Sequence, residues 1–185
     1  MLIVGITGTL GAGKGTIVDY LTEQRGFIHF SVRAYLLEEI RRQGLPGNRD
    51  SMVIVANELR RRYGPSYVTD QLFFEAEQIG KNCVIESIRT PGEVFSLREK
   101  GNFFLFAVDA RPETRYHRIQ LRQSETDEIS YATFLENEKR EMSTSDPNKQ
   151  NLAACKNMAD YIFTNDAKKE DLFLEVEKVL SQIML

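Results

Sequence analysis

The fold of this chain is decided by the stretch Gly8-Thr9-Leu10-Gly11-Ala12-Gly13-Lys14-Gly15-Thr16. It holds the spacing Gly-x-x-x-x-Gly-Lys, and it joins an apolar run to a segment of helical periodicity. Because glycine has no Cβ, backbone N–H groups in such a loop can converge on phosphate oxygens. The N-terminus of the following helix adds a partial positive charge. The stretch therefore predicts a phosphate-binding loop, in which Lys14 reaches the β- and γ-phosphates of a nucleotide.

The rest of the chain alternates between short apolar runs and segments of helical periodicity. Strands are predicted over residues 2–7, 27–31, 83–87, 102–109 and 161–163. Helices are predicted over residues 14–24, 33–43, 51–62, 66–79, 112–122, 131–141, 149–158 and 168–184. Apolar strands separated by helices are typical of a parallel sheet that is covered on both faces. We therefore predict an α/β, three-layer P-loop NTPase fold with a five-stranded parallel sheet, whose ligand lies outside the carboxyl ends of the strands.

Length and composition exclude several classes of function. With 185 residues, 42% of them apolar and 28% charged, the chain fits one globular domain over residues 1–185. The net charge of −3 is unfavourable for binding nucleic acid, and no apolar run reaches the roughly 20 residues that cross a membrane. The first residues lack the basic segment of a signal peptide. Two cysteines, Cys83 and Cys155, are expected to be buried thiols, so we expect a cytoplasmic protein.

Arginine is concentrated in two segments. Eleven of the 15 arginines lie either between the second and third predicted strands or in the helix after the fourth. In that helix four of them form one stripe, at the spacing i, i+4, i+7 and i+11: Arg111, Arg115, Arg118 and Arg122. Like charges in a stripe repel each other unless anions neutralise them, and a guanidinium group matches phosphate oxygens. The pattern indicates either a polyphosphate across the strand ends or a solvated basic face.

The form Gly-Lys-Gly-Thr over residues 13–16 resembles the P-loop of adenylate kinase and other nucleoside monophosphate kinases. The resemblance implies ATP and Mg²⁺ as cofactors, an acceptor-binding arm over about residues 32–80, and a lid over about residues 115–145. Lys14, Arg118 and Arg122 would then be catalytic, and the loop over residues 123–129 would be the moving part. The same resemblance implies contacts with ATP by Gly8, Thr9, Leu10, Gly11, Ala12, Gly13, Lys14, Gly15 and Thr16, and with its adenine ring by Asn165 and Asp166.

The segment after the third predicted strand, Glu86-Ser87-Ile88-Arg89-Thr90-Pro91, carries a second resemblance. It is similar to the Asp-Gly-x-Pro-Arg element of monophosphate kinases. It is more similar still to an uncharacterised archaeal family related to dephospho-CoA kinase, which has an acidic residue followed by Gly-Ile-Arg-Ser-Pro. A similar domain precedes a deoxycytidylate deaminase in some longer chains, which favours a deoxynucleotide acceptor. The resemblance implies that Glu86 and Thr16 hold Mg²⁺, and that Arg89 is catalytic and binds a substrate phosphate.

One segment departs from these kinases. Where they carry an Asp and, three residues later, an Arg after the second strand, this chain has Ala34 and Leu37. A ribose hydroxyl benefits from a general base, whereas the phosphate oxygen of a monophosphate is already anionic and needs only positioning and charge neutralisation. The missing Asp therefore favours a phosphate acceptor. The candidate substrate-binding residues are Ser31, Arg33, Arg60, Glu86 and Arg89.

The leading hypothesis is an ATP-dependent phosphotransferase that moves the γ-phosphoryl group of ATP to a nucleoside or deoxynucleoside monophosphate. Its partner is a small-molecule nucleotide rather than nucleic acid or a membrane, and we expect a monomer or a homodimer. A dephospho-CoA kinase and an ATP-binding regulatory module without efficient transfer are the alternatives. The polar stretch over residues 143–151 either borders the lid or forms an ordinary surface loop.

Overall fold

The computed structural model describes residues 1–122 and 129–184. Along the described chain, strands and helices follow one another in the order β1 (Ile3–Gly8), α1 (Lys14–Arg25), β2 (Ile28–Ser31), α2 (Val32–Arg42), α3 (Arg49–Tyr63), α4 (Tyr67–Ile79), β3 (Cys83–Glu86), α5 (Pro91–Glu99), β4 (Phe103–Asp109), α6 (Pro112–Arg122), α7 (Tyr131–Met142), α8 (Leu152–Asn157), β5 (Tyr161–Thr164) and α9 (Lys169–Ile183). Within the described ranges, none of these helices has the length and apolar character needed to span a bilayer.

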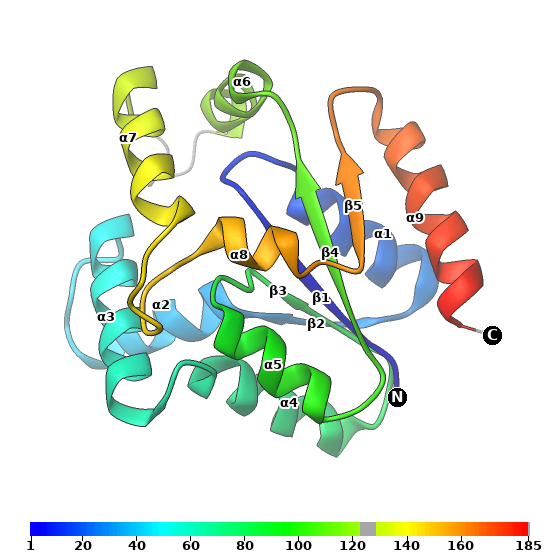
Figure 1. Ribbon diagram of the computed structural model, residues 1–185, viewed down its shortest axis with the longest axis horizontal. Helices are drawn as coiled ribbons and strands as arrows, with labels where there is room; N and C mark the ends of the chain where they lie inside the picture. Colours follow the sequence, from blue (N-terminus) through cyan, green and yellow to red (C-terminus); the bar gives the residue numbers. More distant parts are fainter. Residues whose placement is uncertain (123–128, 185) are drawn as a thin grey trace.

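The five strands form one parallel sheet in the order β2-β3-β1-β4-β5, which confirms the predicted fold class (Figure 1). The first strand, β1, lies at the centre, where Ile3 pairs with Cys83 on one side and with Phe103 on the other. Because all strands run in the same direction, the ends of β1, β3 and β4 meet at one edge of the sheet. These ends carry the glycine-rich loop, Glu86 and Asp109.

Each face of the sheet has its own apolar core (Figure 1). On one face, α1 and α9 cover the sheet, and Tyr20 stacks on Phe173 where these two helices meet. The other face is covered by α2, α3, α4, α5 and α8. The two cysteines are buried and free, as predicted. The helices of both layers pack on the faces of the sheet, and a ligand site is expected at the strand ends.

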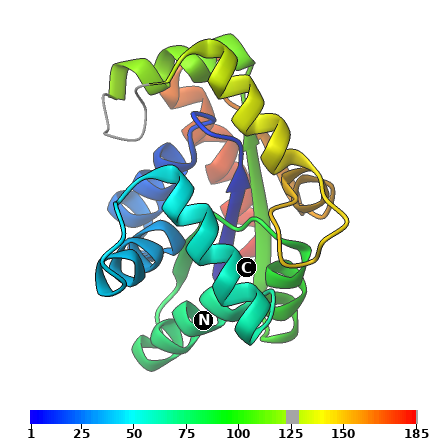
Figure 2. The same cartoon turned by 90° about the vertical axis from the view of Figure 1, so that its left-hand side faces the viewer.

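Helices α6 and α7 lie beyond the carboxyl ends of the strands, with α3 beside them (Figures 1 and 2). The predicted arm over about residues 32–80 corresponds to α2, α3 and α4, and the predicted lid over about residues 115–145 includes most of α6 and all of α7. Of the loop predicted to move, residues 123–128 lie outside the described residues.

The sequence pattern missed one helix, α5. Its apolar residues do not form a continuous stripe, although Val94 and Leu97 are buried. The start of the helix is instead encoded by a capping box, in which the Thr90 side chain accepts from the backbone N–H of Glu93 and the Glu93 side chain accepts from that of Thr90. Pro91 occupies the first helical position, where its missing N–H costs nothing.

The helix predicted over residues 149–158 is shorter than expected, because α8 begins at Leu152. The Asn151 side chain accepts a hydrogen bond from Ala154 N at 3.0 Å and so fixes the start of the helix. Residues 149–151 therefore belong to the polar connection that leads into the site described below.

Gly5 tests how tightly the central strand is packed. A Cβ at this position would lie 2.5 Å from Ile88 Cδ1 and 2.6 Å from Phe103 Cε2. We expect Gly5→Ala to cost about 1–3 kcal/mol, which lowers Tm by roughly 2–4 °C for each kcal/mol in a chain of this size. Gly47→Ala is the matched control, because a Cβ there meets nothing within 4 Å. Equal Tm values for the two variants in thermal unfolding would contradict the packing described for β1.

Candidate functional site

The glycine-rich loop joins β1 to α1 and packs closely against two other parts of the chain. Gly11 has φ +77°, and a Cβ there would lie 2.5 Å from the carbonyl oxygen of Arg115 in α6. Gly13 has φ +106°, and its Cβ would collide with the Asn165 side chain after β5. Gly13 is also the N-cap of α1 and supplies no capping side chain. The first backbone N–H groups of α1 can therefore serve an anionic ligand.

Lys14 is buried at the centre of this loop. Its Nζ donates to the carbonyl oxygens of Gly8 and Thr9, each at 3.0 Å. Burial is the main cause that lowers the pKa of Lys14 from 10.5 to about 7, and the nearby charge of Arg89 lowers it further. An anion beside Nζ would favour the protonated form, so the electrostatics of the loop suit a polyphosphate.

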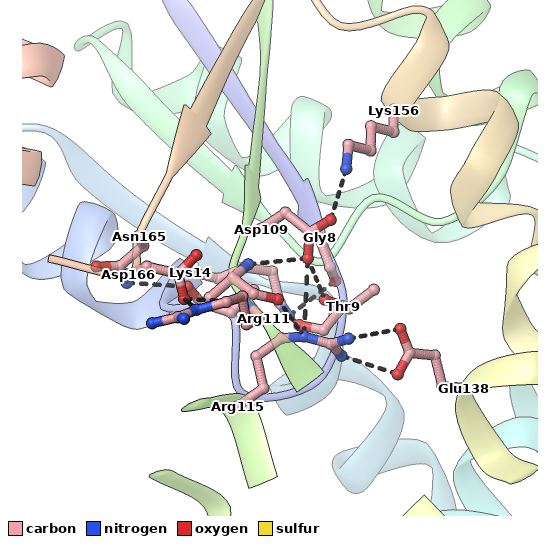
Figure 3. Close-up of polar contacts among 12 residues, drawn as sticks. Gly8, Thr9, Lys14, Asp109, Arg111, Arg115, Glu138, Lys156, Asn165 and Asp166 are labelled. Carbon is pink, nitrogen blue, oxygen red and sulfur yellow. Dashed lines mark hydrogen bonds and ion pairs between the residues drawn. The ribbon is translucent and has the colours of Figure 1, made fainter. Parts of the chain in front are cut away.

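Asp109, at the end of β4, links the loop to α8 (Figure 3). Its carboxylate accepts from Thr9 Oγ1 at 3.1 Å, from Ala110 N at 2.9 Å and from Lys156 Nζ at 2.5 Å. Burial opposes ionisation, but the hydrogen bond from Lys156 and its charge outweigh burial and hold the pKa of Asp109 below its ordinary value. This carboxylate therefore fixes the start of the loop against the end of β4.

Asn165 and Asp166, which were predicted to lie by the adenine ring, hold backbone groups around the loop (Figure 3). Asn165 is buried and donates from Nδ2 to the carbonyl oxygen of Ala12 at 2.9 Å. Asp166 accepts from the backbone N–H of Arg111 at 2.9 Å. Their contact with an adenine ring stays a prediction, while the contacts just given assign both side chains a supporting role.

A first cavity lies beside the loop. It is lined by Leu10, Gly11, Gly13, Lys14, Gly15, Thr16, Asp19, Glu86, Arg118, Ile119 and Arg122. The cavity thus brings together the loop, the end of β3 and two arginines of α6, all of which were predicted to contact ATP or its metal. Arg118 has a buried Nη1 atom for which the described structure offers no hydrogen-bond partner. A ligand with phosphate oxygens would supply one.

Glu86 is the acidic residue of this cavity. It accepts from His29 Nε2 at 3.3 Å and from Ser87 Oγ at 3.3 Å. Burial opposes ionisation, but the hydrogen bond from His29 and the charge of Lys14 hold the pKa of Glu86 below its ordinary value. The described residues contain no cluster of three or more His, Cys, Asp or Glu side chains able to hold a metal. One carboxylate and the Thr16 hydroxyl nevertheless fit Mg²⁺, which usually keeps waters and phosphate oxygens among its six ligands.

A second cavity lies between the loop, α2, α3 and the segment after β3. Its cationic lining consists of Lys14, Arg33, Arg49, Arg60, Arg89 and Arg122, and its acidic lining of Glu86 and Glu141. An apolar wall is supplied by Leu10, Val32, Leu36, Met52, Val53 and Ala56. The excess of guanidinium groups over carboxylates suits an anionic ligand, and the apolar wall suits a ring or chain attached to it.

Arg60 is the most deeply buried cation of this cavity, with 1% of its surface exposed. Its Nη2 lies 3.3 Å from Glu93 Oε1, and Glu93 is itself fully buried. In the described structure Arg60 Nε and Nη1 have no hydrogen-bond partner.

Ser31, a second predicted substrate-binding residue, caps α2 by accepting from Ala34 N at 3.2 Å. Arg60 is thus placed for an anion, whereas Ser31 has a local structural role.

The arginine stripe on α6 divides into different roles. Arg115, one of the arginines expected to face either a polyphosphate or solvent, instead makes two hydrogen bonds to the Glu138 carboxylate at 2.7 and 3.0 Å, and it is buried (Figure 3). Neither expectation holds for Arg115, because an acidic partner on α7 neutralises this cation within the protein. Arg118 and Arg122 do line the cavity beside the loop.

Sequence reasoning missed Glu141 as a site residue. Glu141 is 4% exposed at the end of α7, and its two carboxylate oxygens accept from Arg49 Nη2 at 2.5 Å and from Arg89 Nη1 at 2.8 Å. Burial opposes ionisation, but the charges of Arg89 and Arg49 hold the pKa of Glu141 below its ordinary value. No local pattern marks Glu141, since its partners are far away in the sequence.

Comparisons with known proteins identify relatives along the whole chain. The family model described as "AAA domain" matches residues 4–144. A UPF0200 protein of Methanococcus vannielii is 28% identical, and the alignment covers 100% of this chain and 98% of the relative. A UPF0200 protein of Pyrobaculum aerophilum is 30% identical, with 98% of each chain covered.

Solved structures share the fold at lower sequence identity. TT1252 from Thermus thermophilus has a TM-score of 0.60 and 20% identity, covering 98% of this chain and 97% of its own. Shikimate kinase from Bacteroides thetaiotaomicron has a TM-score of 0.57 and 16% identity, covering 97% of this chain and 98% of its own. The fold described above is therefore shared with these two proteins.

The pKa of Lys14 predicts a pH dependence of stability. Since this pKa falls from 10.5 to about 7 in the folded state, the unfolded chain binds more protons between these values. The contribution of Lys14 to the free energy of unfolding therefore rises with pH over that range. We expect Lys14→Met to be stabilised relative to the wild type at pH 6, with the difference declining toward pH 10.

Urea unfolding at several pH values measures this difference, and Lys81→Met, a change at an exposed lysine, serves as the control. A Lys14→Met difference that stays constant with pH would show that the amine titrates normally in the folded protein.

Proposed function

Because this chain belongs to the UPF0200 family and its AAA domain spans residues 4–144, we propose that it is an ATP-dependent phosphotransferase acting on a nucleoside or deoxynucleoside monophosphate. The observation that carries this proposal is that the two cavities adjoin. Both are lined by Leu10, Lys14, Glu86 and Arg122. A donor in one cavity and an acceptor in the other would thus meet beside an ammonium group, a carboxylate and a guanidinium group.

The cavity beside the loop is proposed to bind ATP. Backbone N–H groups of the loop and of the first turn of α1 would contact the phosphates, and Lys14 would contact the β- and γ-phosphates. Thr16 and Glu86 would hold Mg²⁺, either directly or through water. When bound, Mg²⁺ supplies positive charge that neutralises the phosphate oxygens. Arg118 and Arg122 would stabilise the charge of the transferring phosphoryl group.

The second cavity is proposed to bind the acceptor. Arg33, Arg60 and Arg89 would contact its phosphate, and the apolar wall would contact its sugar and base. The acidic lining favours a phosphate acceptor over a hydroxyl acceptor, because Glu141 is already engaged by two guanidinium groups and Glu86 by His29. A phosphate oxygen is anionic and needs no base to remove a proton, so transfer depends on positioning and charge.

An acceptor panel tests the proposal. ADP release is measured with each ribo- and deoxynucleoside monophosphate, and with dephospho-CoA, shikimate and gluconate as competing acceptor classes. We expect turnover with one or more monophosphates and formation of the corresponding nucleoside diphosphate. Turnover only with dephospho-CoA, shikimate or gluconate would replace the proposed acceptor. Tight ATP binding without turnover on any acceptor would favour a regulatory nucleotide-binding module.

Glu86→Gln tests the proposed metal-binding role. The amide keeps the size of the side chain but removes its charge, so we expect the Mg²⁺ concentration for half-maximal activity to rise roughly tenfold. Tm serves as the check on folding, and Glu136→Gln, on the exposed surface of α7, serves as the charge control. An unchanged Mg²⁺ requirement in a folded Glu86→Gln protein would remove Glu86 from the metal site.

A further inference from the structure

Arg89 is held at three points by residues 141–151, a stretch that begins in the last turn of α7. Its Nη1 donates to Glu141 Oε2 at 2.8 Å and to Gln150 Oε1 at 2.7 Å. Its backbone carbonyl oxygen accepts from the N–H of Asn151 at 2.8 Å. From the sequence, residues 143–151 of this stretch were open to two interpretations, as a border of the lid or as a surface loop. Its contacts connect it to the acceptor cavity.

Both side-chain contacts use the same nitrogen of Arg89. A guanidinium group has five N–H donors in a planar fork, and two parallel donors on one edge bind a phosphate or carboxylate. By taking Nη1 alone, Glu141 and Gln150 fix the rotation of the plane and leave the edge formed by Nε and Nη2. Arg89, Glu141 and Gln150 all line the acceptor cavity. The orientation of the guanidinium plane therefore determines which N–H donors of Arg89 face a ligand in this cavity.

Glu141 also holds a second arginine of the cavity. Its other carboxylate oxygen accepts from Arg49 Nη2 at 2.5 Å, and Arg49 begins α3. Without an anion between them, the two guanidinium groups would repel each other. A buried carboxylate that bridges them sets their separation and lets both remain in the cavity without a ligand. Glu141 therefore links α7 to α3 and to the segment after β3.

We propose that Glu141 and Gln150 are positioning residues, which orient Arg89 so that its Nε and Nη2 donors face the phosphate of the acceptor. The identity of this ligand as the acceptor rests on the proposed function. The binding of a phosphate group by Nε and Nη2 of Arg89 does not. A different role for Glu141, as an internal anion that competes with the ligand for Arg89, makes the opposite prediction: removing its charge would then strengthen phosphate binding.

The experiment compares Glu141→Gln, Gln150→Met and the control Glu136→Gln, an exposed position on the same helix as Glu141. Two quantities are measured for each: the acceptor KM alongside the ATP KM, and the Kd of inorganic phosphate with ADP saturating the loop. We expect Glu141→Gln to raise the acceptor KM and the phosphate Kd about tenfold, with the ATP KM changed by less than about twofold. Gln150→Met is expected to act in the same direction.

A double-mutant cycle with Arg89→Lys tests whether Glu141 acts through Arg89, because lysine has no fork to orient. In the Arg89→Lys background, Glu141→Gln should weaken phosphate binding by less than about twofold. An equal effect in both backgrounds, an unchanged Kd, or tighter phosphate binding would overturn the proposal. If Glu141→Gln does not fold, an unchanged Kd in Gln150→Met overturns it.

The phosphate measurement separates this proposal from the proposed function. Wild-type protein that transfers phosphate to no acceptor would refute the phosphotransferase, yet the Kd values of the variants would still decide whether Glu141 and Gln150 orient Arg89.

Discussion

The position of β1 at the centre of a parallel sheet is the constraint on which the site depends. Because β1 pairs with β3 and with β4, the loop that follows it emerges between the ends of both neighbours. Glu86 and Asp109 are therefore brought to the two sides of the loop by the hydrogen-bonding of the strands. The close approach of the loop to Arg115 and Asn165 then leaves no room for side chains at Gly11 and Gly13.

Several arginines near the site are neutralised by acidic residues from other helices. Arg60 pairs with Glu93, Arg115 with Glu138, and Arg49 and Arg89 share Glu141. Burial makes an unpaired charge costly, so removing one partner of such a pair would destabilise the fold as well as displace the donors of the other. They also separate arginines that are satisfied, such as Arg115, from those that keep unpartnered nitrogens, such as Arg60.

The sequence predicts the parts of the fold and site that depend on local patterns. The glycine spacing, the apolar strands and the long amphipathic helices such as α9 are of this kind, and Lys14, Glu86 and Arg89 were found next to strand ends. Helix α5 was missed because its sequence shows a capping box at the start but no continuous apolar stripe. Glu141 was missed because its partner Arg49 lies 92 residues away, and only the folded chain brings the two together.

The side chain of Glu93 makes several structural contacts at once. It completes the cap of α5, accepts from the backbone N–H groups of Arg89 and Thr90, and pairs with Arg60. Any replacement would disturb a helix, a turn and a buried cation together, so this position tolerates little change. Three apolar residues of α3 that line the second cavity, Met52, Val53 and Ala56, make no polar side-chain contacts of this kind. Substitutions on that wall of α3 would therefore change the shape of the cavity and leave its charged residues in place.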